Sequence, residues 1–96
     1  MVKDAANLES NIKQIERDLH RTQPDHPAFK SEQMLSMLKT VLVEYAHIDE
    51  EVGYVQGMNF VAAALLYHCG NVEDSLRILN YLMKVSGYRK VFLGDL

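Results

Sequence analysis

The chain has 96 residues, enough for one domain around one hydrophobic core. Apolar residues make up 48% and charged residues 24%, which are values of a soluble globular domain and exclude a disordered chain. A formal net charge of −3 argues against a nucleic-acid module, because such modules carry a net basic face. The single cysteine, Cys69, excludes an internal disulfide and hence a disulfide-stapled secreted scaffold.

No segment has the character of a membrane span or a targeting signal. The longest apolar run covers residues 60–67 and is much shorter than the roughly 18 residues that a bilayer requires. Lys3 is not followed by the apolar region of a secretory signal. We therefore expect a reduced, cytoplasmic domain that does not insert into membranes.

The first predicted helix covers about residues 4–20. Its apolar side chains recur at spacings of three and four, which is typical of one buried helical face: Leu8, Ile12, Ile15 and Leu19. Pro24 and Pro27 cannot continue a helix, so residues 22–30 are predicted to be loop.

The second predicted helix begins after Ser31, a suitable N-cap, and ends near residue 46. Its buried face is predicted to consist of Met34, Leu35, Leu38, Val41, Leu42 and Tyr45. The acidic residues 49–51 and Gly53 then predict a solvated turn.

The third and fourth predicted helices are separated by Gly70. Residues 58–69 are apolar on almost every face, which predicts a helix buried on all sides. The next helix starts at Asn71, whose side chain can cap the free amides together with Asp74. Its apolar stripe is Leu76, Leu79, Leu82 and Met83, and Gly87 is predicted to end it.

These patterns predict an all-α fold with about four helices, and no segment shows the alternation of a strand. Three helices form a thin cover for a helix that is apolar on every face. The chain also ends at Asp95 and Leu96 without a polar tail. We therefore expect the sequence to be part of a larger helical domain.

Two polar side chains are candidates for chemistry, and each also has a structural interpretation. Arg21 lies opposite the apolar stripe of the first helix, with Asp18 as an i,i+3 partner. For Arg21 considered alone, we favour the interpretation that it is a surface residue whose charge complements the helix dipole. Gln56 lies between Gly53 and Gly57, where spacing alone favours a tight turn whose amide satisfies backbone groups. The alternative is that Gln56 holds a water molecule or bridges two chains, because its amide both donates and accepts.

Other kinds of site are not indicated. The four histidines are scattered, no Cys–His cluster is present, and Cys69 is interpreted as a small core residue. Residues 49–51 lack the spacing of a calcium loop. Gly53 and Gly57 are not followed by the Lys-Ser or Lys-Thr of a phosphate-binding loop. The chain is therefore expected to hold no metal and no nucleotide of its own.

Two motifs occur in a fixed order. Residues 15–22 read I-x-x-D-x-x-R-T, and residues 54–59 read Y-x-Q-G-M-N. With these motifs the sequence resembles the TBC domain of Rab GTPase-activating proteins, in which the same two signatures occur in this order. Pro24, Phe29 and the pair Tyr45-Ala46 also resemble the family. The second motif is the more specific, and the resemblance covers about residues 8–96.

The resemblance implies catalysis in trans on a bound Rab GTPase in its GTP form. Arg21 matches the arginine that enters the active site of the Rab, and Gln56 matches the glutamine that positions the attacking water. The supporting motif positions are Asp18, Tyr54, Ile15 and Gly57, among which Asp18 would hold Arg21 and Tyr54 would support the glutamine loop. GTP and Mg²⁺ would belong to the partner. The implied location is cytoplasmic, peripheral to endomembranes through the Rab.

The sequence departs from the family in its length. The family domain is much longer than 96 residues, its N-terminal arginine–tryptophan motif is absent, and the chain contains no Trp. We interpret residues 1–96 as a single partial TBC domain that lacks its C-terminal half. The apolar surface of this chain that the missing half would cover is then exposed, which predicts a sticky or oligomeric chain unless a partner covers it. The alternative function is a non-catalytic fragment that binds a Rab or another protein.

Overall fold

The computed structural model describes residues 5–85, 87 and 90. Its elements are α1 (Ala5–Leu19), a 3₁₀ helix η1 (Pro27–Lys30), α2 (Glu32–Ile48), α3 (Met58–Cys69) and α4 (Val72–Val85). The described residues contain four α-helices and no strand. The predicted all-α fold is therefore confirmed, whereas the chain end at residues 95–96 lies outside the described part.

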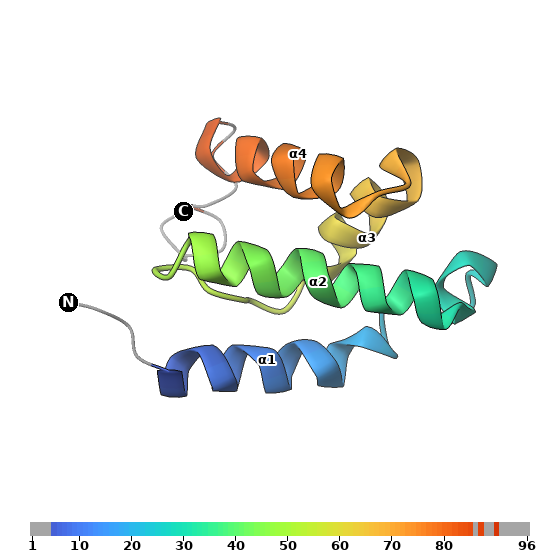
Figure 1. Ribbon diagram of the computed structural model, residues 1–96, viewed down its shortest axis with the longest axis horizontal. Coiled ribbons are helices and arrows are strands. Elements are labelled where there is room, and N and C mark those ends of the chain that lie inside the picture. Colours follow the sequence, from blue (N-terminus) through green and yellow to red (C-terminus); the bar gives the residue numbers. More distant parts are fainter. Residues whose placement is uncertain (1–4, 86, 88–89, 91–96) are drawn as a thin grey trace.

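Helix α2 is the centre of the fold. It packs against α1, α3, α4 and η1, and Figure 1 shows α1 and α4 on opposite sides of it. The buried face of α2 includes Leu38, Val41, Leu42 and Tyr45, each fully shielded from solvent. Met34 and Leu35, which were also expected there, are half-buried. Of the α1 stripe expected from the sequence, Ile15 and Leu19 pack into the same core. The other two members are half-buried. A single core thus joins the helices and fixes their relative positions.

The helix boundaries follow from side chains that cap free backbone groups. The Ser31 hydroxyl accepts a hydrogen bond of 3.3 Å from the Met34 amide. The Asn71 Oδ1 accepts one of 2.8 Å from the Asp74 amide at the start of α4. Gly70 ends α3 in the left-handed region, with φ of 79°. These three caps confirm the helix starts and stop expected from the sequence.

The segment between α1 and α2 is more ordered than a plain loop. Pro27 occupies the first position of η1, where its missing N–H costs nothing. His26 caps the turn, because its Nδ1 accepts a hydrogen bond of 3.1 Å from the Ala28 amide. Phe29 is buried and anchors the turn to the core. The prediction of loop throughout 22–30 was therefore wrong for residues 27–30.

Helix α3 is buried on one side only, which corrects the expectation that it is buried all round. Met58, Ala62 and Leu66 are fully shielded, whereas Phe60 is 46% and Tyr67 is 51% exposed. Within the described part of the chain, α3 packs against α1, α2 and α4, and these contacts leave Phe60 and Tyr67 uncovered. Cys69 at the end of α3 is half-buried rather than a core residue.

The turn after α2 is attached to the core rather than solvated. Asp49 is buried, and its Oδ2 accepts a hydrogen bond of 2.6 Å from the Tyr45 hydroxyl. Its Oδ1 accepts one of 3.3 Å from the Val52 amide. The expectation of a solvated acidic turn is thus wrong for Asp49, although Glu50 and Glu51 are exposed. The buried aspartate fixes the start of the segment that carries Gln56.

Candidate functional site

Arg21 and Gln56 lie in two turns, one after α1 and one before α3. The first turn is closed by backbone hydrogen bonds from Arg21 to Asp18 (3.0 Å) and from Thr22 to Leu19 (3.2 Å). The Arg21 side chain is 58% exposed just beyond the end of α1. Gln56 is also exposed, two residues before the start of α3. Both candidate side chains are therefore accessible to a partner.

Asp18 connects the two turns. It is buried, and its Oδ2 accepts a hydrogen bond of 2.6 Å from the Tyr54 hydroxyl. Its Oδ1 accepts from Arg21, as expected from the sequence, and from Gln14 Nε2 at 3.2 Å. A carboxylate on α1 is thus bonded both to Arg21 and to the segment that carries Gln56.

The protonation states of this pair agree with the hydrogen bonds. Burial alone would raise the pKa of Asp18, but the hydrogen bonds from Tyr54, Arg21 and Gln14 outweigh it and hold the pKa below its usual 3.8. Burial, and then the hydrogen bond to Asp18, raise the pKa of Tyr54 well above its usual 10.0. At neutral pH, Asp18 is an ionised acceptor and Tyr54 a protonated donor.

A second, uncharged connection lies beside the first. The Thr22 hydroxyl donates to the Asp18 carbonyl at 2.7 Å and accepts from Asn59 Nδ2 at 2.7 Å. Asn59 Oδ1 in turn accepts from the Gly57 amide at 2.9 Å. Thr22 and Asn59 are both buried. This path joins the turn of Arg21 to the peptide that follows Gln56.

The structure distributes the six predicted site residues over three environments. It brings Asp18, Arg21 and Tyr54 into direct contact. Gln56 is exposed beside Gly57, which has a φ of 109° that favours glycine at this position. Ile15 is fully buried in the core.

Sequence reasoning gave no role to Gln14, Thr22 and Asn59, although all three join the hydrogen bonds of the site. Thr22 and Asn59 are the last residues of the two motifs, so a polar residue at the end of each motif was the available signal. Gln14 precedes Asp18 by four residues, the spacing at which helical side chains meet.

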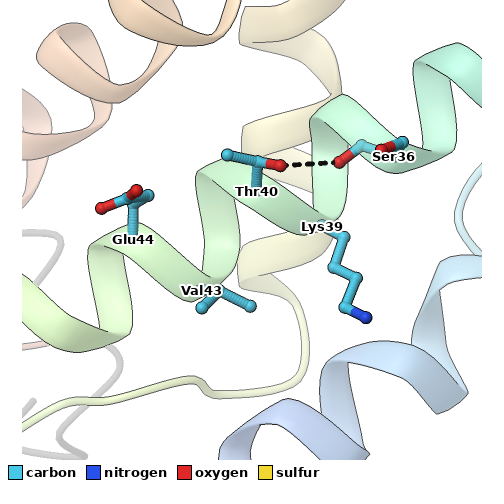
Figure 2. A pocket seen from close by; sticks show the side chains of 5 residues that line it. All are labelled: Ser36, Lys39, Thr40, Val43 and Glu44. Carbon is cyan, nitrogen blue, oxygen red and sulfur yellow. Dashed lines mark hydrogen bonds between the residues drawn. The ribbon is translucent and has the colours of Figure 1, made fainter.

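Other kinds of site find no support in the described part of the chain. No three His, Cys, Asp or Glu side chains there cluster in a way that could hold a metal ion. No helix there has the length and apolar character to cross a bilayer. Figure 2 shows an open surface pocket on α2, lined by Ser36, Lys39, Thr40, Val43 and Glu44. None of these residues belongs to the two turns, and the Lys39 ammonium already pairs with Glu16 at 2.8 Å.

Comparison with known proteins decides the family. The family model of the Rab-GTPase-TBC domain matches residues 1–96, the whole chain. The chain belongs to this family. The resemblance drawn from the two motifs is thereby confirmed.

Curated relatives of this TBC chain come from fungi and mammals. It is 43% identical to the GTPase-activating protein GYP5 of Saccharomyces cerevisiae over 82% of the chain and 8% of that protein. It is 46% identical to the GTPase-activating protein gyp2 of Schizosaccharomyces pombe over 68% of the chain and 10% of that protein. It is 40% identical to human TBC1 domain family member 1 over 82% of the chain and 7% of that protein. No solved structure gives a significant match.

The TBC chain is short relative to these proteins. The matched segment covers a tenth or less of the length of each of the three relatives. Family membership therefore describes residues 1–96 and not the whole length of these larger proteins.

Proposed function

We propose that this chain carries the two catalytic side chains of a Rab GTPase-activating domain, Arg21 and Gln56. The observation that carries the proposal is the hydrogen bonding of Asp18 to both Arg21 and Tyr54. It joins two segments that are 36 residues apart in sequence and leaves Arg21 and Gln56 exposed. Membership of the TBC family and the GTPase-activating names of two relatives support the same function.

The chemistry of GTP hydrolysis needs both side chains. The transition state spreads charge over the γ-phosphate oxygens, and an arginine supplied by a partner stabilises this charge. In other GTPases such an arginine accelerates hydrolysis by about 10³–10⁵, which corresponds to roughly 4–7 kcal/mol of the barrier. The amide of Gln56 would hold the attacking water in line, because it can donate and accept at once. A lysine would replace Arg21 poorly, since only the planar guanidinium can bridge two phosphate oxygens.

The partner in this proposal is a Rab GTPase in its GTP form, which supplies both the nucleotide and Mg²⁺. The chain itself contributes no cofactor. Its place of action is the cytoplasmic face of endomembranes, reached through the membrane-bound Rab.

The test is a GTP-hydrolysis assay over a panel of Rab proteins. Wild type is expected to stimulate GTP hydrolysis by at least one Rab. Arg21→Ala is expected to lower the stimulated rate about 10³-fold, and Gln56→Ala about 10²-fold or more. Matched controls are Arg77→Ala, an exposed arginine paired with Glu73 on α4, and Gln33→Ala, an exposed glutamine on α2. Equal stimulation by Arg21→Ala and Arg77→Ala would contradict the proposal.

A second candidate, binding without catalysis, is favoured by the apolar side chains exposed on α3 and α4. Phe60, Tyr67, Tyr81 and Val85 are between 46% and 63% exposed. A binding module predicts that a folded chain binds a Rab or another protein without changing hydrolysis. Binding would then be unaffected by Gln56→Ala and weakened by Phe60→Ser.

A further inference from the structure

In the uncharged connection between the two turns, the hydrogen bonds fix which group is the donor and which is the acceptor at Thr22, Asn59 and Gly57. The Thr22 hydroxyl has one hydrogen, which it donates to the Asp18 carbonyl at 2.7 Å. Towards Asn59 it can therefore only accept, so the NH₂ group of Asn59 faces Thr22. The amide oxygen of Asn59 then faces the Gly57 N–H at 2.9 Å. Reversing the amide of Asn59 would set donor against donor at Gly57.

The two ends of this path are backbone groups, and each adjoins one candidate catalytic residue. The Asp18 carbonyl also accepts the backbone N–H of Arg21, so it belongs to the turn that presents Arg21. The Gly57 N–H belongs to the peptide that joins Gln56 to Gly57. Gly57 has a φ of 109°, a backbone conformation that residues with side chains rarely adopt. The path therefore fixes the backbone after Gln56 relative to the backbone at Arg21.

We propose that Thr22 and Asn59 are positioning residues that hold the Gln56 turn in register with Arg21. This inference rests on the proposed function. The charged connection, from Asp18 to Arg21 and Tyr54, orients Arg21, whereas the uncharged path acts through Gln56. Both residues of the path are 1–2% exposed, so their side chains are not accessible to a nucleotide or GTPase bound at the surface. Displacing catalytic groups by about 1 Å can cost about 10²-fold in rate, so a small shift of the Gln56 turn is sufficient.

The kinetic test replaces Thr22 by valine, which has the same shape but lacks the hydroxyl. In the wild-type background, Thr22→Val is expected to lower the stimulated kcat about tenfold and to leave the KM for the Rab within about twofold. In a Gln56→Ala background, the same substitution is expected to change kcat by less than about twofold. Thr22→Ser, which keeps the hydroxyl, is expected to retain the wild-type rate.

The matched control is Thr40→Val on α2. The Thr40 hydroxyl donates to the Ser36 carbonyl at 3.0 Å, the same i−4 bond that Thr22 makes to Asp18, but it lies away from the two turns. A purely structural role of Thr22 would lower kcat by the same factor with and without Gln56, and that result would overturn the proposal. If Thr22→Val does not fold, Thr22→Ala removes the same acceptor without placing a methyl group against the Asn59 amide.

A second measurement needs no GTPase. Amide hydrogen exchange of Gly57 is expected to be at least about tenfold faster in Thr22→Val than in wild type or Thr40→Val. The Gly70 amide, which donates to the Leu66 carbonyl at 2.8 Å, is the internal reference. Unchanged exchange at Gly57 would reject the positioning role even if hydrolysis is stimulated. Accelerated exchange without stimulation of any Rab would reject the proposed function and retain the coupling of the two turns.

Discussion

At the scale of single residues, Asp18 is the acceptor on which the candidate site depends. Its carboxylate is 1% exposed and accepts hydrogen bonds from Tyr54, Arg21 and Gln14. A buried carboxylate is costly unless such donors surround it, and here they hold its pKa below the usual value. Because the folded pKa is the lower one, ionised Asp18 stabilises the folded chain at neutral pH.

Asp18→Asn is expected to destabilise the chain at pH 7 by about 1–3 kcal/mol, since the charge that Arg21 and Tyr54 contact is removed. The wild-type stabilisation is full well above pH 3.8, the usual pKa, and is lost as the pH falls through the lower folded pKa. Urea unfolding at several pH values should therefore show a gap between wild type and variant that narrows in acid. Asp25→Asn, at an exposed position, is the control. A gap independent of pH would contradict this account of Asp18.

Tyr54→Phe removes the hydroxyl that donates to Asp18 at 2.6 Å. We expect a loss of about 1–3 kcal/mol, because the buried carboxylate loses a donor and nothing replaces it. The pKa of Asp18 should rise, so that acid unfolding begins at a higher pH than in wild type. Thermal unfolding followed by circular dichroism at several pH values measures both the loss of stability and the pH at which acid unfolding begins. Tyr81→Phe, at a side chain that is 61% exposed, should change the stability by less than about 0.5 kcal/mol.

At the scale of elements, the segment between α2 and α3 packs closely against α1. A Cβ on Gly53 would lie 2.6 Å from Asn11 Nδ2, and the φ of Gly53 is +61°. The close approach allows Tyr54, the next residue, to reach Asp18 on the same helix. The backbone conformation thus favours glycine here, and a Cβ would also displace the Asn11 amide.

Gly53→Ala is expected to destabilise the chain more than Gly70→Ala. Gly70 also has a positive φ, of +79°, but nothing lies within 4 Å of a Cβ placed there. Both variants incur backbone strain of about 1–2 kcal/mol, and Gly53→Ala adds up to about 1 kcal/mol because the Asn11 amide must shift. A double-mutant cycle with Asn11→Ala, followed by urea unfolding, should remove the additional part. Additive effects of the two substitutions would contradict the contact.

At the scale of the whole molecule, the helices enclose one core but leave several large apolar side chains of α3 and α4 exposed to solvent. These exposed apolar side chains, 38–63% accessible to solvent, are Phe60 and Tyr67 on α3 and Ile78, Tyr81 and Val85 on α4. Exposed apolar surface of this kind promotes association. The expectation of a sticky chain drawn from the sequence remains a prediction.

Tyr81→Lys with Val85→Lys is expected to weaken self-association, because two of the most exposed apolar side chains become charged. Stability should change by no more than about 0.5 kcal/mol for each exposed position. Sedimentation velocity over a range of concentrations measures the association. The control Ser36→Lys with Thr40→Lys adds the same charge at exposed polar positions of α2. An equal effect of both pairs would assign the change to net charge rather than to the apolar surface.

Local features of the chain could be predicted because they depend on residues a few positions apart. Apolar spacings of three and four predicted α1, α2 and α4, and the caps Ser31, Asn71 and Gly70 predicted where helices begin or end. The same short range links Asp18 to Arg21 within one helical turn. The two motifs were sufficient to place the chain in its family.

Contacts between distant segments depended on how the helices pack. Periodicity could not show that Tyr54 reaches Asp18 across 36 residues or that Asn59 reaches Thr22 across 37. It also gave the wrong environment for α3, because apolar composition shows what a helix can bury and not which neighbours are present to cover it. The position of Arg21 relative to Gln56 is therefore decided by the tertiary structure. The hydrogen bonds that join their two turns can form only when α1 and α3 are packed into the same core.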